Sequence, residues 1–242
     1  MPAIFPTLAA GAILLSPQRT VSAPVEIVTF QDGHEQRWPS APILQAWNLT
    51  VRCNSTDLAS MLSFIDTVKG GYDSTWTFGF DGASYTNCVF DLDDYVLQRK
   101  ALANLYEITL KIRQTRQSLS MGSALTAWPT INGGVMTQYP YSETRKWATA
   151  KAAMSNGLQY AYSRWVYPKR MWNLAYPVIT ATEAAALLTA FLQARGPWRE
   201  FSLTDPRTGS TFSHCRLDSQ SIQMTYNAGT MATAVMIAEL FG

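Results

Sequence analysis

The sequence has few of the side chains on which enzymes depend. Its 242 residues include 2 histidines and 3 cysteines, and only 15% of the residues are charged. It contains no G-x-S-x-G, no H-E-x-x-H, no phosphate-binding G-x-x-x-x-G-K-[ST] and no paired C-x-x-C. We therefore expect that the protein is not an enzyme and that it holds no cofactor and no metal ion.

Charge and hydropathy exclude two further classes of partner. Nineteen Lys and Arg residues and 17 Asp and Glu residues give a net charge of +2, and the basic residues are dispersed. A nucleic-acid site needs a basic patch or stripe, so no specific nucleic-acid binding is expected. No uncharged run reaches the ~20 apolar residues that a membrane span requires, so no membrane partner is expected.

The histidines and acidic residues are too scattered to suggest a metal site. His34 and His214 lie in different sequence contexts, and His214 and Cys215 are neighbours that would point to opposite faces of a strand. The cluster Asp91, Asp93 and Asp94 offers fewer oxygens than a calcium loop needs. We expect solvated turns or edges at these positions.

The chain repeats itself. Phe5-Pro6-Thr7 returns as Trp128-Pro129-Thr130, and Trp47-Asn48-Leu49 returns as Trp172-Asn173-Leu174. Single residues recur in the same order: Gly11 and Gly134, Pro17 and Pro140, Gly33 and Gly157, Gly70 and Gly196, Cys88 and Cys215. The offset rises from 123 to 127. A period this long exceeds that of solenoid repeats and predicts two homologous modules, residues 1–113 and 127–242, joined by a linker at 114–126.

The repeat also bears on the N-terminus and the thiols. The apolar stretch 4–15 resembles a signal peptide but has no basic start, and its counterpart lies in the middle of the chain, so we expect it to belong to the first module. Cys88 and Cys215 fall at matching positions of separate modules and are poorly placed to pair. Free, buried thiols in a reducing compartment fit this arrangement.

Each module carries one helical pattern. Apolar residues recur at a spacing of three and four from Leu58 to Val68 and again from Ala184 to Phe191. Asn54 and Thr180 precede the patterns, each with an acidic residue three positions later, as helix N-caps do. Gly70 and Gly196 follow the two patterns at the position of a left-handed C-cap. The sequence predicts a helix of about 13 residues in each module.

Alternating strands surround these helices. Trp47, Leu49 and Val51 alternate with polar residues, as do the aromatic side chains of 75–80 and the aliphatic ones of 106–113. The segment 231–240 is apolar on both faces and is expected to be covered on both sides. The predicted fold class is mainly β (α+β), with two tandem homologous antiparallel β-sandwich modules, each with one flanking α-helix.

Aromatic residues are abundant, with 8 Trp, 11 Tyr and 10 Phe. Core filling explains many of them, whereas others favour an exposed platform for sugars or a protein interface, where Trp and Tyr are enriched. The candidate interface residues are Trp38, Tyr139, Tyr141, Tyr160, Tyr162, Trp165 and Trp198.

One segment resembles a known family. Phe30-Gln31-Asp32-Gly33-His34-Glu35-Gln36-Arg37 is similar to the F-x-D-G-[YH]-E-Q-R signature of the minor tail protein M family of lambda-type phages. The order of elements that follows is also similar, and the chain resembles the distal tail protein group. The second module lacks the signature. The resemblance implies a tail-tube-like domain that forms a ring and joins the tail tube to the hub or baseplate, with a channel for DNA and the tape-measure protein.

The resemblance also implies partners and a location. The chain would form a homo-hexameric ring, or a homo-trimer with pseudo-sixfold symmetry, and would contact the tail tube protein, hub or baseplate proteins and the tape-measure protein. It would be synthesised and assembled in the host bacterial cytoplasm and would reside in the virion tail. An alternative of a different class is a tandem carbohydrate-binding or receptor-binding tail component.

Overall fold

Antiparallel β-strands make up most of the structure, a computed structural model that describes residues 3–6, 13–30, 35–68, 75–91, 96–99, 104–115, 123–131, 134–147, 149–154, 158–163, 168–227 and 229–240. This confirms the mainly β class. The helices are α1 (Ser55–Thr67) and α2 (Ala181–Ala194). The strands are β1 (Ala3–Ile4), β2 (Ile13–Ser22), β3 (Val25–Thr29), β4 (Glu35–Pro39), β5 (Leu44–Cys53), β6 (Trp76–Phe80), β7 (Ala83–Phe90), β8 (Val96–Arg99), β9 (Tyr106–Gln114), β10 (Gln138–Lys146), β11 (Thr149–Ala153), β12 (Gln159–Ser163), β13 (Lys169–Ile179), β14 (Phe201–Thr204), β15 (Thr211–Leu217), β16 (Ser221–Asn227) and β17 (Thr230–Glu239).

The chain folds into two compact units, neither of which is continuous in sequence. Unit 1 comprises Met1–Ser22, Pro42–Leu119 and Gln223–Ala232, and unit 2 comprises Ala23–Ala41, Ser120–Ile222 and Thr233–Gly242. Strands β3 and β4, from the N-terminal part of the chain, thus belong to unit 2. The turn between β16 and β17, from the C-terminal part, belongs to unit 1. The expected boundary between homologous modules at 114–126 stays a prediction.

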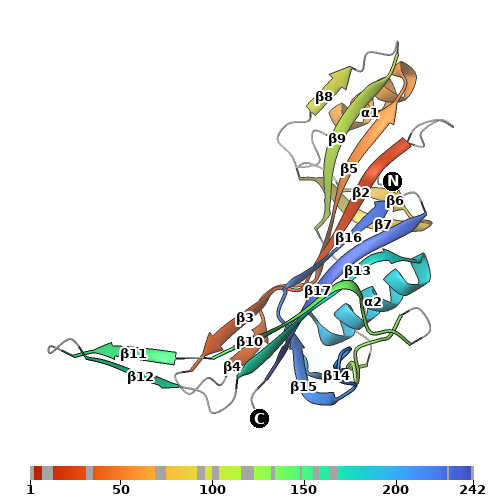
Figure 1. Ribbon diagram of the computed structural model, residues 1–242. Helices are drawn as coiled ribbons and strands as arrows, with labels where there is room; N and C mark the ends of the chain where they lie inside the picture. Colours follow the sequence, from red (N-terminus) through yellow and green to blue (C-terminus); the bar gives the residue numbers. More distant parts are fainter. Residues whose placement is uncertain are drawn as a thin grey trace. The chain divides into compact units, whose positions relative to one another are not determined.

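Unit 1 is a sheet with α1 on one face (Figure 1). Its strands follow the order β1-β6-β7-β9-β5-β2-β16, and β8 pairs with β9. Trp47, Leu49 and Val51 alternate into the core as their spacing predicts, and each is 1% exposed. Met61 of α1 packs into the same cluster with Trp76 of β6. The apolar faces of helix and sheet cover each other and remove both from water.

In unit 2, α2 lies along one face of the strands β10, β13, β17, β15 and β14 (Figure 1). Strand β17 pairs with β15 and neighbours β13, β14 pairs with β15, and β13 pairs with β10. Leu187, Ala190 and Phe191 of α2 are buried. The hairpins β3–β4 and β11–β12 form separate two-stranded sheets. Within the described residues, β10 pairs only with β13, so its other edge is open.

The helix N-termini match their predictions. Asn54 Oδ1 accepts a hydrogen bond from Asp57 N at 2.9 Å. Thr180 and Glu183 form a capping box, in which Glu183 Oε2 accepts from Thr180 N at 2.8 Å. The left-handed C-cap of α2 is Arg195, with a φ of 52°, and Gly196, predicted for that position, follows it with a φ of 58°. Gly70 lies outside the described residues.

Strand β17 corrects one expectation. It was expected to be covered on both sides, but most of its side chains alternate. Met231, Thr233 and Val235 are buried, whereas Ala234 and Met236 are exposed. The neighbouring residues Ile237 and Ala238 are both buried, so both faces are covered only near the end of the strand.

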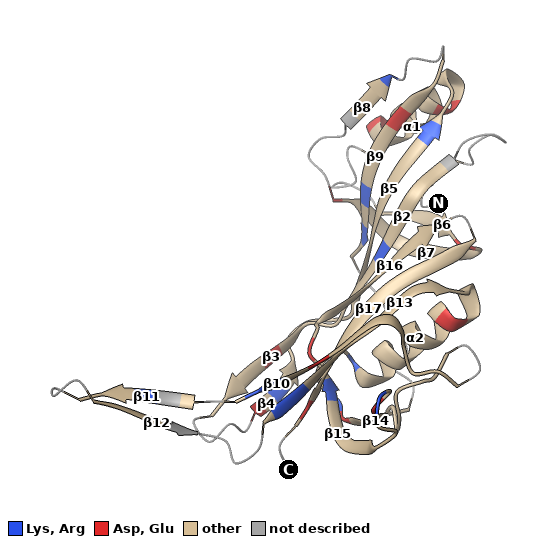
Figure 2. Cartoon of the chain, viewed as in Figure 1, with Lys and Arg blue, Asp and Glu red and all other residues tan. Residues whose placement is uncertain are grey.

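Charged residues are dispersed in the structure, as they are in the sequence. Figure 2 shows Lys and Arg positions dispersed along the chain among uncharged residues, with Asp and Glu positions between them. In the described part of the chain, neither helix is long and apolar enough to cross a membrane.

Candidate functional site

A surface pocket of unit 2 lies along the open edge of β10. It measures about 640 Å³ and opens between the beginning of β10 and the turn that joins β14 to β15. Its lining residues are Thr130, Gly134, Val135, Met136, Thr137, Gln138, Tyr139, Tyr141, Thr204, Asp205, Pro206, Arg207 and Gly209. Tyr139 is 90% exposed and Val135 is 48% exposed. Apolar side chains at an open strand edge favour association over isolation in water.

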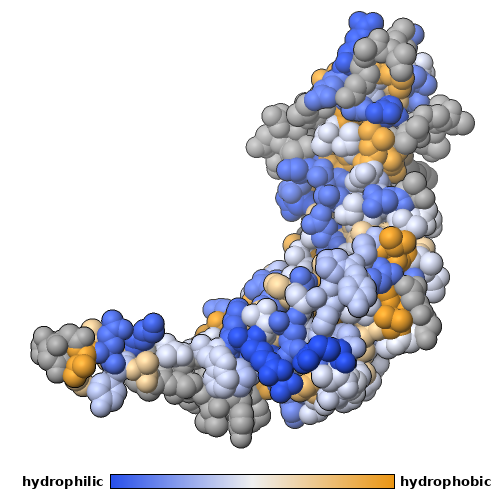
Figure 3. Space-filling model, in the orientation of Figure 1, coloured by the Kyte–Doolittle hydropathy of each residue, from blue (hydrophilic) through white to orange (hydrophobic). Residues whose placement is uncertain are grey.

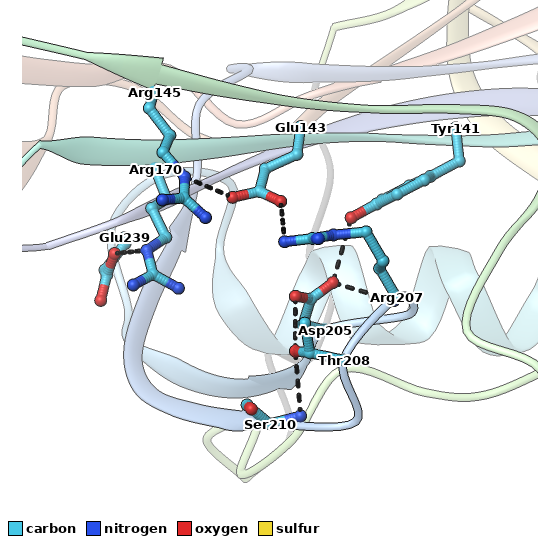
Figure 4. Close-up of polar contacts among 9 residues, drawn as sticks. All are labelled: Tyr141, Glu143, Arg145, Arg170, Asp205, Arg207, Thr208, Ser210 and Glu239. Carbon is cyan, nitrogen blue, oxygen red and sulfur yellow. Dashed lines mark hydrogen bonds and ion pairs between the residues drawn. The ribbon is translucent and has the colours of Figure 1, made fainter.

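The floor of the pocket is held by Asp205, which is 1% exposed. Its carboxylate accepts hydrogen bonds from the Tyr141 hydroxyl at 3.0 Å, from Arg207 N at 3.0 Å and from Thr208 Oγ1 at 2.7 Å (Figure 4). Burial alone would raise the pKa of Asp205, but these hydrogen bonds outweigh it and keep the pKa below its usual value. Burial, together with the Asp205 carboxylate, raises the pKa of Tyr141 to about 12.

A charged cluster surrounds Asp205. Glu143 accepts from Arg145 Nε at 3.0 Å and from Arg207 Nη2 at 3.2 Å (Figure 4). Arg170 Nε lies 3.5 Å from Glu239 Oε2, and burial raises the pKa of Glu239. Acids and bases in this cluster balance, and Glu143 and Asp205 accept hydrogen bonds from protein donors. The cluster braces the turn beside the pocket.

The signature segment has a structural role in unit 2. Arg37, whose side chain is 3% exposed, donates from Nη1 to the carbonyl of Pro197 at 3.0 Å and pairs with Glu35. Glu35 also pairs with Lys169 Nζ at 3.2 Å. Burial opposes ionisation of Glu35, but Arg37 and Lys169 together lower its pKa. These contacts fasten the hairpin β3–β4 to the end of α2 and the start of β13. Residues 31–34, including His34, lie outside the described residues.

The predicted interface residues fall into three groups. Tyr139 and Tyr160 are strongly exposed, at 90% and 61%, and Trp38 is 37% exposed with its indole N–H bonded to Glu26 Oε2 at 3.0 Å. Tyr141 and Trp198 are half-buried.

Different contacts hold the remaining candidates. Tyr141 is bonded to Asp205, and Trp198 lies between the guanidinium groups of Arg195 and Arg199, at 5.0 and 5.2 Å from its ring centre. Tyr162 lies on β12, where its backbone is described, and Trp165 lies outside the described residues. The structure therefore brings Tyr139 and Tyr141 to the pocket and places Tyr160 and Tyr162 on the β11–β12 hairpin.

Sequence reasoning missed two exposed apolar residues near these elements, Met154 and Leu158 at the turn of β11–β12, which are 48% and 61% exposed. Trp147, which precedes β11, is 57% exposed. Figure 3 shows apolar atoms among polar ones on this hairpin. The signal that was available is the run of small and apolar residues in 147–162, which lacks the strict alternation of a half-buried strand.

The residues considered as possible metal ligands make other contacts where they are described. His214 is exposed, with Nδ1 3.0 Å from Glu200 Oε2, while Cys215 beside it is buried. Asp91 pairs with Arg113 at 2.8 Å, and Asp93 and Asp94 lie outside the described residues. Across the described part of the chain, no group of three or more His, Cys, Asp or Glu side chains could hold a metal ion.

Unit 2 thus presents an open strand edge, a pocket and an exposed hairpin. Comparison of the sequence with models of protein families and with curated proteins finds no match.

Proposed function

We propose that this chain is a structural, non-enzymatic protein of a long-tailed bacteriophage, a distal or minor tail protein that forms a ring between the tail tube and the hub or baseplate. The link to phage tails comes from the resemblance of Phe30 through Arg37 to the tail-protein signature. The observation that carries the assembly role is the open edge of β10 with its pocket and its exposed hairpin.

The pairing pattern supports two homologous, tail-tube-like β-sandwich modules in tandem. In residues 3–114, β1 runs parallel to β6, and antiparallel pairs join β6 to β7, β7 to β9, β8 to β9, β9 to β5 and β5 to β2. In residues 127–239, Ala127 bridges in parallel to Ser202, and pairs join β14 to β15, β15 to β17, β16 to β17, β17 to β13 and β13 to β10. The strand partners recur in the same order.

The two hairpins give the most detailed support for duplication. Val25 pairs with Pro39 and Thr29 with Glu35 in β3–β4. Thr149 pairs with Ser163 and Ala153 with Gln159 in β11–β12. Each residue of the second set lies 124 positions after its counterpart, and the three pairs between them follow the same register. Two unrelated hairpins have no reason to share length, register and place in the element order.

A ring follows from the kind of surface that unit 2 presents. Open sheet edges are normally protected or paired. Contacts between different patches of identical chains close into rings when the rotation permits. We propose a homo-hexameric ring, with a homo-trimer of pseudo-sixfold symmetry as the alternative. The ring would contact the tail tube protein, the hub or baseplate proteins and the tape-measure protein in the virion tail.

A second candidate function is binding of carbohydrate or of a host receptor. The exposed rings of Tyr139, Tyr160 and Trp147 favour it, because aromatic faces stack on sugars as well as on proteins. The two functions differ in their response to substitution. A receptor-binding component loses glycan binding when these three residues become serine, and its oligomeric state stays unchanged.

Electron microscopy of the purified protein, together with analysis of phage tails, tests the first function. We expect ring-shaped particles and a band of this protein in the purified tail fraction. Monomers at every concentration reached, together with absence of the protein from tails, would refute the proposal. Binding on a glycan array that is lost in the serine variants, in the absence of rings, would favour the second candidate.

A further inference from the structure

The hairpin of the N-terminal half is already docked in unit 2. Ala23, two residues before β3, is 2% exposed and donates from its N to the carbonyl of Gln220 at 2.7 Å. Gln220 Nε2 donates to the carbonyl of Val25 at 2.9 Å. With the contacts of Glu35 and Arg37 to Lys169 and Pro197, these bonds seat β3–β4 at the end of α2 and the start of β13.

Unit 1 shows the reciprocal arrangement with strand β16. This strand, from the C-terminal half of the chain, is the neighbour of β2. The ring of Tyr226 at its end packs edge-on against Phe80, with ring centres 5.0 Å apart. The edge of β2 and the end of β6 are therefore covered by an element from the other half of the sequence.

In unit 2, the positions that correspond to the edge of β2 and the end of β6 have no such covering strand among the described residues. The counterpart of β2 is β10, which pairs only with β13 in the described part of the chain. Asp205, which directly follows β14, corresponds to Phe80, the last residue of β6. The pocket of about 640 Å³ that Asp205 lines therefore corresponds to the place next to Phe80 that Tyr226 fills in unit 1. Strand β8 is the counterpart of β16, because each pairs with the last strand of its half of the chain, β9 or β17. A β8 strand is therefore the element that would cover the edge of β10.

The hairpin β11–β12 is uncovered as well. Its described side chains are all exposed, and its strands pair only with each other. An isolated two-stranded hairpin is marginally stable in water. Trp147 stands two residues before β11, as Ala23 stands before β3, yet Trp147 is 57% exposed whereas Ala23 is buried. A large aromatic side chain at the position of a buried residue indicates a surface that is covered by a partner.

We propose that the partner is a second copy of this chain, docked so that the contacts made within one chain are repeated between chains. Strand β8 of the second copy adds to the open edge of β10. The hairpin β11–β12 of the first copy lies on the N-terminal half of the second, at the end of α1 and the start of β5. The proposal rests on the ring-forming function proposed above and names the surfaces through which the ring closes.

The contact arithmetic follows from this arrangement. Each chain supplies one docked hairpin internally and one to its neighbour. Three chains then supply six hairpin contacts, so this docking fits the homo-trimer of pseudo-sixfold symmetry rather than the homo-hexamer. Head-to-tail contacts of this kind close without leaving an open β10 edge.

A cross-link between two defined positions tests the docking. Glu35 and Lys169 are paired within the chain, and their counterparts are Gln159 in the hairpin register and Leu44, which lies three residues before Trp47 as Lys169 lies three before Trp172. We would treat the double variant Gln159→Cys/Leu44→Cys with a short bis-maleimide, since an ion pair of two long side chains spans more than a disulfide permits. The natural cysteines are all buried. The matched control is Gln159→Cys/Ser60→Cys, because Ser60 is an exposed residue elsewhere on α1.

The expected result is a product of two and three linked chains with the first pair and at most a trace with the control. Equal yields for the two pairs, or no interchain product, would overturn the docking proposal. If rings are seen by electron microscopy and the cross-link still fails, only the docking is wrong. If the protein remains monomeric at every concentration reached, the ring function fails with it.

A substitution at Trp147 provides a second, independent test. Trp147→Ser should raise the dissociation constant of assembly, measured by analytical ultracentrifugation, at least ~10-fold, as loss of an interface anchor does. Met236→Ser is the control, because Met236 is also exposed, at 42%, and lies on β17, which the proposed contacts do not include. Equal effects of the two substitutions would argue against the proposed surface.

Discussion

Trp128 and Tyr176 are joined by a buried hydrogen bond, from the indole N–H to the phenolic oxygen at 2.9 Å. The Tyr176 hydroxyl in turn donates to the carbonyl of Met136 at 3.0 Å. Burial raises the pKa of Tyr176 well above its ordinary value, so the hydroxyl stays protonated and able to donate. This short chain of bonds fastens the segments around residues 128 and 136 to the middle of β13.

Tyr176→Phe removes the shared hydroxyl and leaves a buried indole N–H and a buried carbonyl without their partner. Each such group costs about 1–3 kcal/mol. We expect the free energy of unfolding to fall by about 2–4 kcal/mol in urea titrations. Tyr160→Phe, at an exposed position, is the control and should change it by less than about 0.5 kcal/mol. A loss in Tyr176→Phe no larger than in the control would show that the bonds contribute nothing.

Asp205→Asn tests the buried turn beside the pocket. Because the folded-state pKa of Asp205 is lowered, its charge stabilises the fold above the unfolded-state pKa of about 3.9, and this contribution disappears as the pH falls through the folded-state value. We expect the variant to lose about 2 kcal/mol at neutral pH, typical of charge-assisted bonds, and the difference from wild type to shrink below about pH 4.

Asp91→Asn is the control for that experiment. Asp91 forms an exposed ion pair with Arg113, and pairs of this kind contribute about 0–1 kcal/mol. Urea unfolding of the wild type and both variants at several pH values gives the comparison. A stability difference for Asp205→Asn that is constant with pH would contradict the role of the carboxylate charge.

Arg37→Met should release the docked hairpin β3–β4. The substitution leaves the Pro197 carbonyl and the Glu35 carboxylate without their guanidinium partner, a loss that costs about 3 kcal/mol for a buried pair. Limited proteolysis should then cut the chain between β3 and β4 faster than in wild type. Gln36→Ala, at the exposed neighbouring position, should leave the cleavage rate unchanged.

Gly196→Ala should be more costly than the same change at Gly209. Both glycines have a positive φ, 58° and 72°, which costs an alanine about 1 kcal/mol. A Cβ at Gly196 would also lie 3.0 Å from Ala23 Cβ and 3.1 Å from the Ala23 carbonyl oxygen, whereas at Gly209 it would meet nothing within 4 Å. Thermal unfolding should show a markedly larger decrease in Tm for Gly196→Ala. Equal decreases in Tm would mean that Ala23 can move away from a Cβ at residue 196 without a measurable cost in stability.

The helices could be predicted almost completely from the sequence. Their N-caps, their apolar spacing and the glycine after α2 act over a few residues, and each was found in place. Burial within the pattern was less predictable. Met61 and Leu187 are fully buried, while Leu62 and Leu188 beside them are half-buried, because the exact facing of a helix depends on the sheet it packs against.

The candidate site could be predicted in part. Exposure of Tyr139 and Tyr160 agrees with their prediction as interface residues. Tyr141 differs, because its hydroxyl reaches Asp205, which lies 64 residues away in sequence. No local pattern reports such a contact. The open edge of β10 was equally invisible, since a strand pattern does not show whether both of its edges are paired.

By itself, the sequence determined the β-rich class, the two helices with their caps, and the side chains that face the cores, because periodicity and capping are properties of neighbouring residues. Only the tertiary structure decided that β3–β4 belongs to unit 2 and that the turn of β16–β17 belongs to unit 1. Alternation tells which face of a strand is buried, but the partner that buries it is chosen by contacts between residues far apart in the chain, such as Arg37 and Pro197.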